Sequence, residues 1–331
     1  VEIERAVIEA GRWFEDYNRR SWEHPKVRLI EDDARNFLNV SDERYDLIIS
    51  EPSNPWIAGI GNLFTAEFYA LAASSLEPDG IFAQWLPLYE LSPENVRMVL
   101  GEIQRQFSEV SVWHMDTGDI IVLASRQALR LNVDAIDRLW ATDASVRRDF
   151  REFLEIDQPL GLLAHYVTAS DGVRRFATDA SRNTDDRPLL EYSAPRNLYA
   201  QTLELNVELL NQYKATLLPD GLDAATRERA YLAIVDPFLR VDRFDFASRA
   251  VTELATSPRS SDASLYLGMA SATIYSTQFR DAAESLDKAA RAAVNRDIHG
   301  AYRAELRARL GEQQGDRGAA IEHYREALHI D

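Results

Sequence analysis

The stretch that decides the fold is Tyr45–Trp56, with the sequence YDLIISEPSNPW. Its first five residues are rich in branched apolar side chains, which predicts a short buried strand. Pro52 and Pro55 cannot continue a central ladder and each fixes a backbone angle, so the strand ends near Glu51 in a stiff loop. In open α/β sheets, ligands bind at this carboxyl end of the strands. A rigid strand-to-helix connection without any chemistry fits the same residues.

Strands and helices alternate on both sides of this stretch. The patterns predict strands at 27–30, 80–86, 110–113 and 119–125, and helices from Arg5, from Pro93 to Phe107, and over 133–140 and 146–154. The last two strands read as a closing antiparallel pair. The alternation predicts an α/β fold with a mainly parallel sheet and helices on both faces.

Two further acidic residues follow expected strands. Glu2 stands between an opening strand and a helix, where nucleotide-binding α/β folds hold ribose hydroxyls. Asp33 and Ala34 follow the strand expected at 27–30, and an alternative role for Asp33 is to cap the next helix. We expect Glu2, Asp33 and Glu51 to converge on one cleft, because the carboxyl ends of parallel strands share one edge of a sheet.

From about Leu198 the pattern changes to helices alone and becomes self-similar. Ala247, Ala282 and Ala320 are 35 and then 38 residues apart, close to the tetratricopeptide period of about 34 residues. Stacked helix pairs of this kind form a concave face that binds a peptide or a protein partner. Plain helical hairpins remain the alternative. We therefore expect two domains, residues 1–198 and 199–331.

The composition narrows the function classes. The chain has 331 residues and a formal net charge of −17, which disfavours nucleic acid and anionic membranes as partners and suits a cationic substrate. The chain has no Cys, so disulfides, thiolate catalysis and Cys-based metal sites are excluded. The six His residues lack metal-ligand spacing. No apolar run approaches the length of a membrane span.

Residues 47–56, LIISEPSNPW, and residues 62–69, NLFTAEFY, resemble the spermidine synthase (polyamine aminopropyltransferase) family. The resemblance covers roughly residues 1–198 and is strongest to a branch that is often fused to membrane and tetratricopeptide-repeat regions. It implies a partial Rossmann-like, class I methyltransferase-type sheet. It also implies transfer of an aminopropyl group from decarboxylated S-adenosylmethionine, as co-substrate, to a polyamine, without a metal.

The resemblance implies roles for single residues. Glu51 stands where the family has the general base that takes a proton from the attacking amine. The implied nucleoside-binding residues are Glu2, Asp33, Ala34 and Pro55, and the implied amine-binding residues are Asn54, Gln84 and Tyr89.

The chain departs from the family at two of these positions. The family has Asp where this chain has Glu51 and Asn54, so the base is displaced and one charge that would hold a cation is lost. Two alternatives therefore stay open. One is an S-adenosylmethionine-dependent methyltransferase-like enzyme with another acceptor. The other is a non-catalytic nucleotide-binding module whose repeats bind a partner.

Val1–Glu4 resembles the end of a strand, so the chain opens in mid-element. We expect that the first strand of the sheet and its Gly-rich turn are missing, so that the chain as given is an inactive fragment. In this interpretation the chain lies on the cytoplasmic side, with membrane anchoring through a missing upstream domain and no membrane contact of its own.

Overall fold

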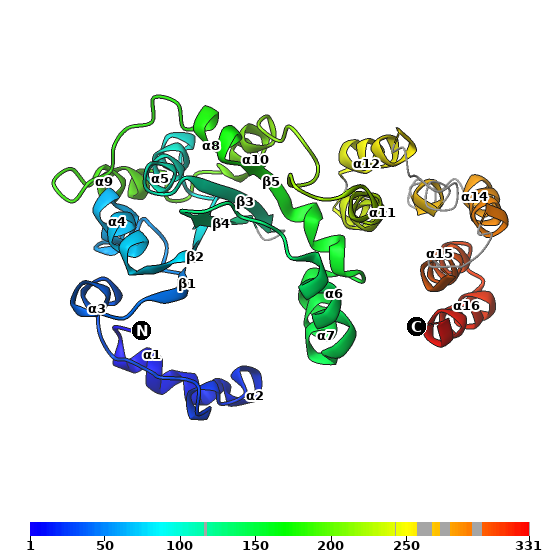
Figure 1. The fold of residues 1–331 in the computed structure, drawn as a ribbon, viewed down its shortest axis with the longest axis horizontal. Helices are drawn as coiled ribbons and strands as arrows, with labels where there is room; N and C mark the ends of the chain where they lie inside the picture. The colour runs from blue at the N-terminus through cyan, green and yellow to red at the C-terminus, as the bar shows by residue number, and fades with distance from the viewer. Residues whose placement is uncertain (116–117, 242, 257–266, 272–278, 293–299, 331) are drawn as a thin grey trace. The chain divides into compact units, whose positions relative to one another are not determined.

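The computed structural model describes residues 1–115, 118–241, 243–256, 267–271, 279–292 and 300–330 (Figure 1). They form two compact units. The first comprises residues 1–129 and 169–213, and the second comprises residues 130–168 and 214–331. Residues 130–168 thus pack with the carboxyl-terminal region, although the sequence suggested the first domain for them. The domain boundary near Leu198 stays a prediction, since packing alone does not show which parts fold independently.

A mixed sheet organises the first unit (Figure 1). Its strands are β1 (Tyr45–Ser50), β2 (Leu76–Pro87), β3 (Glu109–Met115), β4 (Asp119–Ser125) and β5 (Tyr166–Ala169), which contains a boundary between the units. The strand order is β1-β2-β4-β3-β5. β1 and β2 are parallel, and β4 runs antiparallel to both β2 and β3. The arrangement is therefore a five-stranded mixed sheet.

The predicted closing pair is confirmed as β3 and β4, but the expectation of a mainly parallel sheet is wrong. β3 and β4 are joined by three residues, which is too short for the crossover that a parallel pair needs. The strand expected at 27–30 is also wrong. The described structure has only an isolated parallel bridge between Glu2 and Glu31 at this place.

The first unit also contains helices, most of them short. They are α1 (Arg5–Ala10), η1 (Gly11–Phe14), α2 (Glu15–Asn18), η2 (Ser21–Glu23), α3 (Ala34–Val40), η3 (Ile60–Phe64), α4 (Ala66–Ser75), α5 (Pro93–Gln106), α8 (Ser170–Phe176), α9 (Leu189–Ser193), η5 (Ala194–Asn197) and α10 (Leu203–Asn211). The helix predicted from Pro93 is therefore confirmed as α5. Ser92 caps it through a hydrogen bond from Asn95 N to Ser92 Oγ of 3.2 Å.

The core of the first unit lies where α4 and α5 cover β2. Phe82 of β2 stacks on Phe107 with ring centroids 5.6 Å apart, and Tyr69 of α4 meets Phe82 edge-on at 5.7 Å. All three rings are almost fully buried. This aromatic cluster fixes β2, and through the parallel pairing it fixes β1 and the loop that follows.

Every described element of the second unit apart from β5 is helical. The helices are α6 (Val133–Thr142), α7 (Ala144–Leu154), η4 (Pro159–His165), α11 (Ala224–Arg240), α12 (Phe244–Thr256), α14 (Phe279–Ala292), α15 (Gly300–Gln313) and α16 (Arg317–Ile330). Residues 267–271 are helical as well. None of the helices in the described ranges is both long and apolar enough to cross a membrane.

The three alanines that define the sequence periodicity are packed alike. Ala247, Ala282 and Ala320 lie on α12, α14 and α16 and are 1%, 0% and 3% exposed. Positions twelve residues earlier in each segment, Val235, Ala270 and Ala308, are fully buried. Residues with the same spacing thus have the same environment. The 35- and 38-residue intervals therefore describe a repeated helix pair.

Candidate functional site

The loop after β1 brings chemically different side chains together within a few residues. Glu51 is exposed, whereas Pro55 is buried and Asn54 is half-buried. Asn54 accepts a hydrogen bond from Ile57 N through its backbone oxygen at 3.0 Å. Its side-chain Oδ1 is buried and has no hydrogen-bond partner among the described residues.

Gln84 places a second amide oxygen near the same end of the sheet. The residue is fully buried on β2, where it pairs in register with Ser50, the last residue of β1. Its Nε2 donates to the carbonyls of Ser50 at 3.2 Å and Trp85 at 2.9 Å, and this fixes the orientation of the amide. Oε1 is then left without a partner in the described part of the chain. Such an oxygen is costly to bury unless it receives a donor.

An aromatic pair joins the loop to the end of β2. The rings of Trp56 and Tyr89 meet edge-on with centroids 5.8 Å apart. Burial, followed by repulsion from Asp119 and Glu90, raises the pKa of the Tyr89 hydroxyl above its ordinary value. The hydroxyl therefore stays protonated and available as a donor at neutral pH.

Glu2 lies beside the segment that leads to Asp33. Glu2 N donates to Ile30 O at 2.9 Å, and Asp32 N donates to Glu2 O at 3.2 Å. One carboxylate oxygen of Glu2 accepts from Glu4 N at 2.8 Å. The backbone thus brings Glu2 and the Asp33 turn together through an isolated bridge and not through two neighbouring strands.

Asp33 and Ala34 begin α3. Asp33 Oδ1 accepts from Asn36 N at 2.8 Å, so Asp33 is the helix cap that the sequence offered as an alternative. Ala34 is exposed as the first residue of the helix. Asp33 also lines a polar cavity of about 430 Å³ between α3 and α4, with Arg35, Asn36, Asn39, Glu67 and Leu71. Capping leaves the second carboxylate oxygen available for a ligand.

The described contacts join the site residues into two groups. Glu2 lies beside the Asp33 turn through backbone hydrogen bonds. Gln84 is bonded to the end of β1, directly before Glu51. No hydrogen bond or ion pair among the described residues links Glu51 to Glu2 or to Asp33. Their convergence on one cleft stays a prediction.

The sequence did not point to Glu191, which holds the loop from a distance. Its carboxylate accepts from Gly59 N at 2.7 Å and from Gly61 N at 3.1 Å. Asn183 is fully buried and donates through Nδ2 to Phe64 O at 2.9 Å. The two residues thus anchor the segment between the Glu51 loop and α4. Only their place in a polar-then-apolar stretch of the sequence could have drawn attention to them.

Asp185 in the same segment pairs with Arg35, 150 residues away. The two residues are far apart in the sequence, so no local pattern indicates this ion pair. This pairing lowers the pKa of the Asp185 carboxyl. It fastens residues 183–191 to α3 as well as to the Glu51 loop.

Replacing Glu191 by alanine is expected to loosen this loop, because the N–H groups of Gly59 and Gly61 lose a charged acceptor. Loss of hydrogen bonds to a charged group costs about 1.5–3 kcal/mol. Hydrogen–deuterium exchange should therefore become faster over residues 57–64. Glu204→Ala removes an exposed acid of α10 and serves as the control. Unchanged exchange in the Glu191 variant would contradict the anchoring role.

No group of three or more His, Asp or Glu side chains in the described ranges is arranged to hold a metal ion. The side chains at the site instead offer one exposed carboxylate, two amide oxygens, a phenol and an indole. Such a set can accept hydrogen bonds from amine N–H groups, take up a proton and face a cation with aromatic rings.

The comparisons with known proteins agree on one family. Residues 1–116 match the family described as "Spermine/spermidine synthase domain". A polyamine aminopropyltransferase of Serratia proteamaculans is 39% identical over 114 residues, which are 34% of this chain and 39% of that protein. A polyamine aminopropyltransferase of Buchnera aphidicola is 28% identical over 160 residues, 46% of this chain and 55% of that protein. This chain thus spans only about half, or less, of these relatives.

Among solved structures, a spermidine synthase from Thermotoga maritima aligns with 62% of this chain and 59% of its own. The identity is 16% and the TM-score is 0.31. The resemblance to the spermidine synthase family is confirmed by the match over residues 1–116. Fusion to membrane or tetratricopeptide regions stays a prediction.

Proposed function

Because residues 1–116 carry a spermine/spermidine synthase domain, we propose that the first unit serves aminopropyl transfer from decarboxylated S-adenosylmethionine to a polyamine acceptor. The observation that carries the proposal is the pair of buried amide oxygens, Asn54 Oδ1 and Gln84 Oε1, which have no hydrogen-bond partner in the part of the chain that the structure describes. Both lie near the ends of the parallel strands β1 and β2. An amine of the acceptor has the N–H donors that these oxygens lack.

In the proposed reaction, the neutral amine attacks the propyl carbon bonded to the sulfonium of the co-substrate. A carbon–nitrogen bond forms, the carbon–sulfur bond breaks, and its electron pair stays on the sulfur of methylthioadenosine. Glu51 takes the proton from the attacking amine. The side-chain oxygens of Asn54 and Gln84 accept hydrogen bonds from N–H groups of the acceptor. The Tyr89 hydroxyl is a hydrogen-bond donor at the same site, and the ring of Trp56 faces the far ammonium.

Glu2 and Asp33 are the proposed acceptors for the ribose hydroxyls and the adenine amino group, with Ala34 and Pro55 against the nucleoside. The backbone contacts between Glu2 and residues 30–32 support this grouping. The polar cavity beside Asp33 supports it as well. The formal charge of −17 favours the approach of a cationic polyamine.

One observation favours the non-catalytic alternative. β1 has β2 as its described ladder neighbour, and its Leu47 and Ile49 are 51% and 67% exposed. Strands of parallel sheets are normally covered on both faces, so this edge of the site faces water. Water weakens the electrostatic stabilisation of a transition state. We therefore expect nucleoside binding to exceed catalysis in residues 1–331.

For the second unit we propose a tetratricopeptide-like role in binding a protein or peptide. The equally buried alanines of α12, α14 and α16 support stacked helix pairs. Such arrays present a face built from one helix of each pair, and this face commonly takes an extended ligand.

Calorimetry with methylthioadenosine and with putrescine tests the proposed site. We expect Glu2→Gln and Asp33→Asn to weaken methylthioadenosine binding by about tenfold or more, through lost charged hydrogen bonds. Glu51→Gln should leave nucleoside binding unchanged and lower any transfer rate by about 10²–10⁴-fold. Glu43→Gln, an exposed acid of the same unit, is the control. Tight putrescine binding without nucleoside binding would contradict the proposal. Efficient spermidine formation by residues 1–331 would contradict the expectation that a site whose edge faces water is a poor catalyst.

A further inference from the structure

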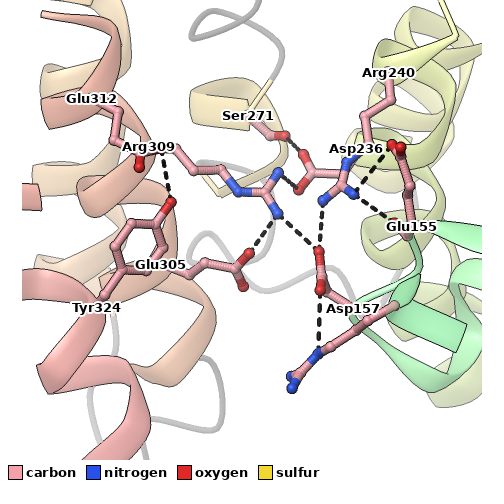
Figure 2. Close-up of polar contacts among 10 residues, drawn as sticks. Glu155, Asp157, Asp236, Arg240, Ser271, Glu305, Arg309, Glu312 and Tyr324 are labelled. Carbon is pink, nitrogen blue, oxygen red and sulfur yellow. Dashed lines mark hydrogen bonds and ion pairs between the residues drawn. The ribbon is translucent and has the colours of Figure 1, made fainter. Parts of the chain in front are cut away.

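One helix of each pair in the second unit contributes a polar residue to a common row. Asp236 of α11, Ser271 and Arg309 of α15 are spaced by 35 and 38 residues, the same intervals as the alanines. They are therefore equivalent positions of successive helix pairs. They also touch one another, since Ser271 Oγ donates to Asp236 and Arg309 Nη1 donates to Asp236 Oδ2 at 2.8 Å (Figure 2).

A segment from outside the helix pairs lies on this row. Asp157, between α7 and η4, accepts from Arg240 Nη2 at 2.6 Å and from Arg309 Nη2 at 3.1 Å. Arg240 Nη1 also donates to the backbone carbonyl of Glu155 at 2.6 Å. Figure 2 shows Asp157 between the two guanidinium groups. One acidic side chain thus bridges the first and the third helix pair.

The contacts of this segment resemble those of an extended peptide ligand. Two arginines of the helix pairs, Arg240 and Arg309, contact the Asp157 carboxylate, which also pairs with Arg151 of α7 at 3.3 Å. Arg240 also binds the main chain at Glu155, and Ile156 is 1% exposed. Glu155 has a φ of 52°, in the left-handed region that costs a non-glycine residue about 1 kcal/mol or more. The segment is therefore held in a strained conformation by its contacts.

The row contains more carboxylates than Arg309 can neutralise. Asp157, Asp236 and Glu305 all contact its guanidinium (Figure 2). Burial raises the pKa of the Glu305 carboxyl, and repulsion from Asp157 and Asp236 raises it further. Arg309 keeps Asp236 and Glu305 as partners when Asp157 leaves. An external acid that takes the place of Asp157 can then pair with Arg240 and Arg309 in its stead.

We propose that the face formed by α11, residues 267–271 and α15 binds extended acidic peptides of the form acid–apolar–acid, and that Glu155–Asp157 occupies this site as an internal, competing ligand. The inference rests on the proposed protein-binding role of the second unit. It adds the class of partner and the autoinhibitory contact. Arg240 and Arg309 recognise the second acid, and Arg240 also recognises the main chain.

Fluorescence anisotropy with a labelled peptide of residues 152–160, EFLEIDQPL, tests the inference on the full chain. Asp157→Asn weakens the internal ligand, so this variant should bind the peptide about tenfold more tightly than the wild type. The matched control is Asp137→Asn, which removes an aspartate paired with Arg229 in the same unit but outside the row. It should bind like the wild type. A peptide with Gln in place of Glu155 and Asn in place of Asp157 should bind neither protein.

Each outcome has one meaning. Equal affinities of Asp157→Asn and Asp137→Asn overturn the internal competition. Equal binding of acidic and neutral peptides keeps a peptide-binding role but overturns acid recognition, whereas no binding of either overturns both. If Asp157→Asn fails to fold, hydrogen exchange of the wild type decides. Saturating acidic peptide must then speed exchange at residues 155–157, and unchanged exchange overturns the inference.

Discussion

Replacing Arg309 by methionine is expected to lower the free energy of unfolding of the second unit by about 3–5 kcal/mol. The guanidinium is 13% exposed and is the shared partner of Asp157, Asp236 and Glu305. Its removal leaves close carboxylates that repel one another in a site with little water. Urea unfolding followed by circular dichroism measures the loss, as a lower midpoint with an unchanged slope.

Arg229→Met is the matched control for this substitution. Arg229 also forms a bidentate ion pair, with Asp137, but its side chain is 44% exposed. Exposed pairs contribute at most about 1 kcal/mol, so the control should be nearly as stable as the wild type. Adding Asp236→Asn to the Arg309 variant should restore part of the loss, because one of the repelling charges disappears. Equal losses in the two arginine variants would show that the network does not hold the unit together.

The sequence predicted those features of the first unit that depend on local patterns. The branched run before Glu51 became β1, but the expectation that this strand is buried is wrong, since Leu47 and Ile49 are 51% and 67% exposed. The Ser92–Pro93 signal became the start of α5. Both follow from residues within one turn or one strand. The family match over residues 1–116 likewise includes the uninterrupted motif around Glu51.

Features that depend on distant partners were not predictable in this way. Residues 27–30 carry a strand-like pattern, but the described backbone contacts form a single bridge at Glu31 and no ladder. Glu191 and Asn183 hold the Glu51 loop from more than 100 residues away, and no local pattern encodes such a pairing. The orientation of the buried Gln84 amide likewise depends on a distant partner, because its Nε2 donates to the end of β1. Its Oε1 is then left without a partner among the described residues.

Periodicity of the second unit had predictive value beyond secondary structure. The intervals read from Ala247, Ala282 and Ala320 also relate Asp236, Ser271 and Arg309, which meet in one network. A repeated helix pair thus turns a spacing in the sequence into contacts between side chains. The spacing could not reveal Asp157, because it lies outside the helix pairs.

Lys214 is the most unusual charged group of the same unit. It is 6% exposed, and Nζ donates to the carbonyl of Tyr166. Rings of Tyr166, Phe238 and Phe246 have their centroids 5.5, 5.7 and 5.3 Å from Nζ. Burial lowers the pKa of the Lys214 ammonium from 10.5 to about 7.

The charges around Lys214 reinforce this shift on balance. Arg243 and Arg249 repel the ammonium and lower its pKa further, and Asp245 opposes them. The folded protein therefore releases a proton that the unfolded chain keeps between pH 7 and about 10. The full cost of the buried charge is present below pH 7 and disappears as the pH rises toward the pKa of the unfolded chain.

Replacing Lys214 by methionine is therefore expected to stabilise the second unit, most strongly at low pH. The pKa shift from 10.5 to about 7 corresponds to about 5 kcal/mol. The lost hydrogen bond and ring contacts offset about 2 kcal/mol. The net gain of about 3 kcal/mol at pH 6 should raise the thermal midpoint by about 6–12 °C. Thermal unfolding from pH 6 to 10 should show this gain shrinking by about 1.4 kcal/mol per pH unit above pH 7 and then changing sign.

Lys288→Met, at a 42% exposed side chain of α14, is the control and should show no such pH dependence. A pH-independent stability difference between Lys214→Met and the wild type would refute the buried-charge account.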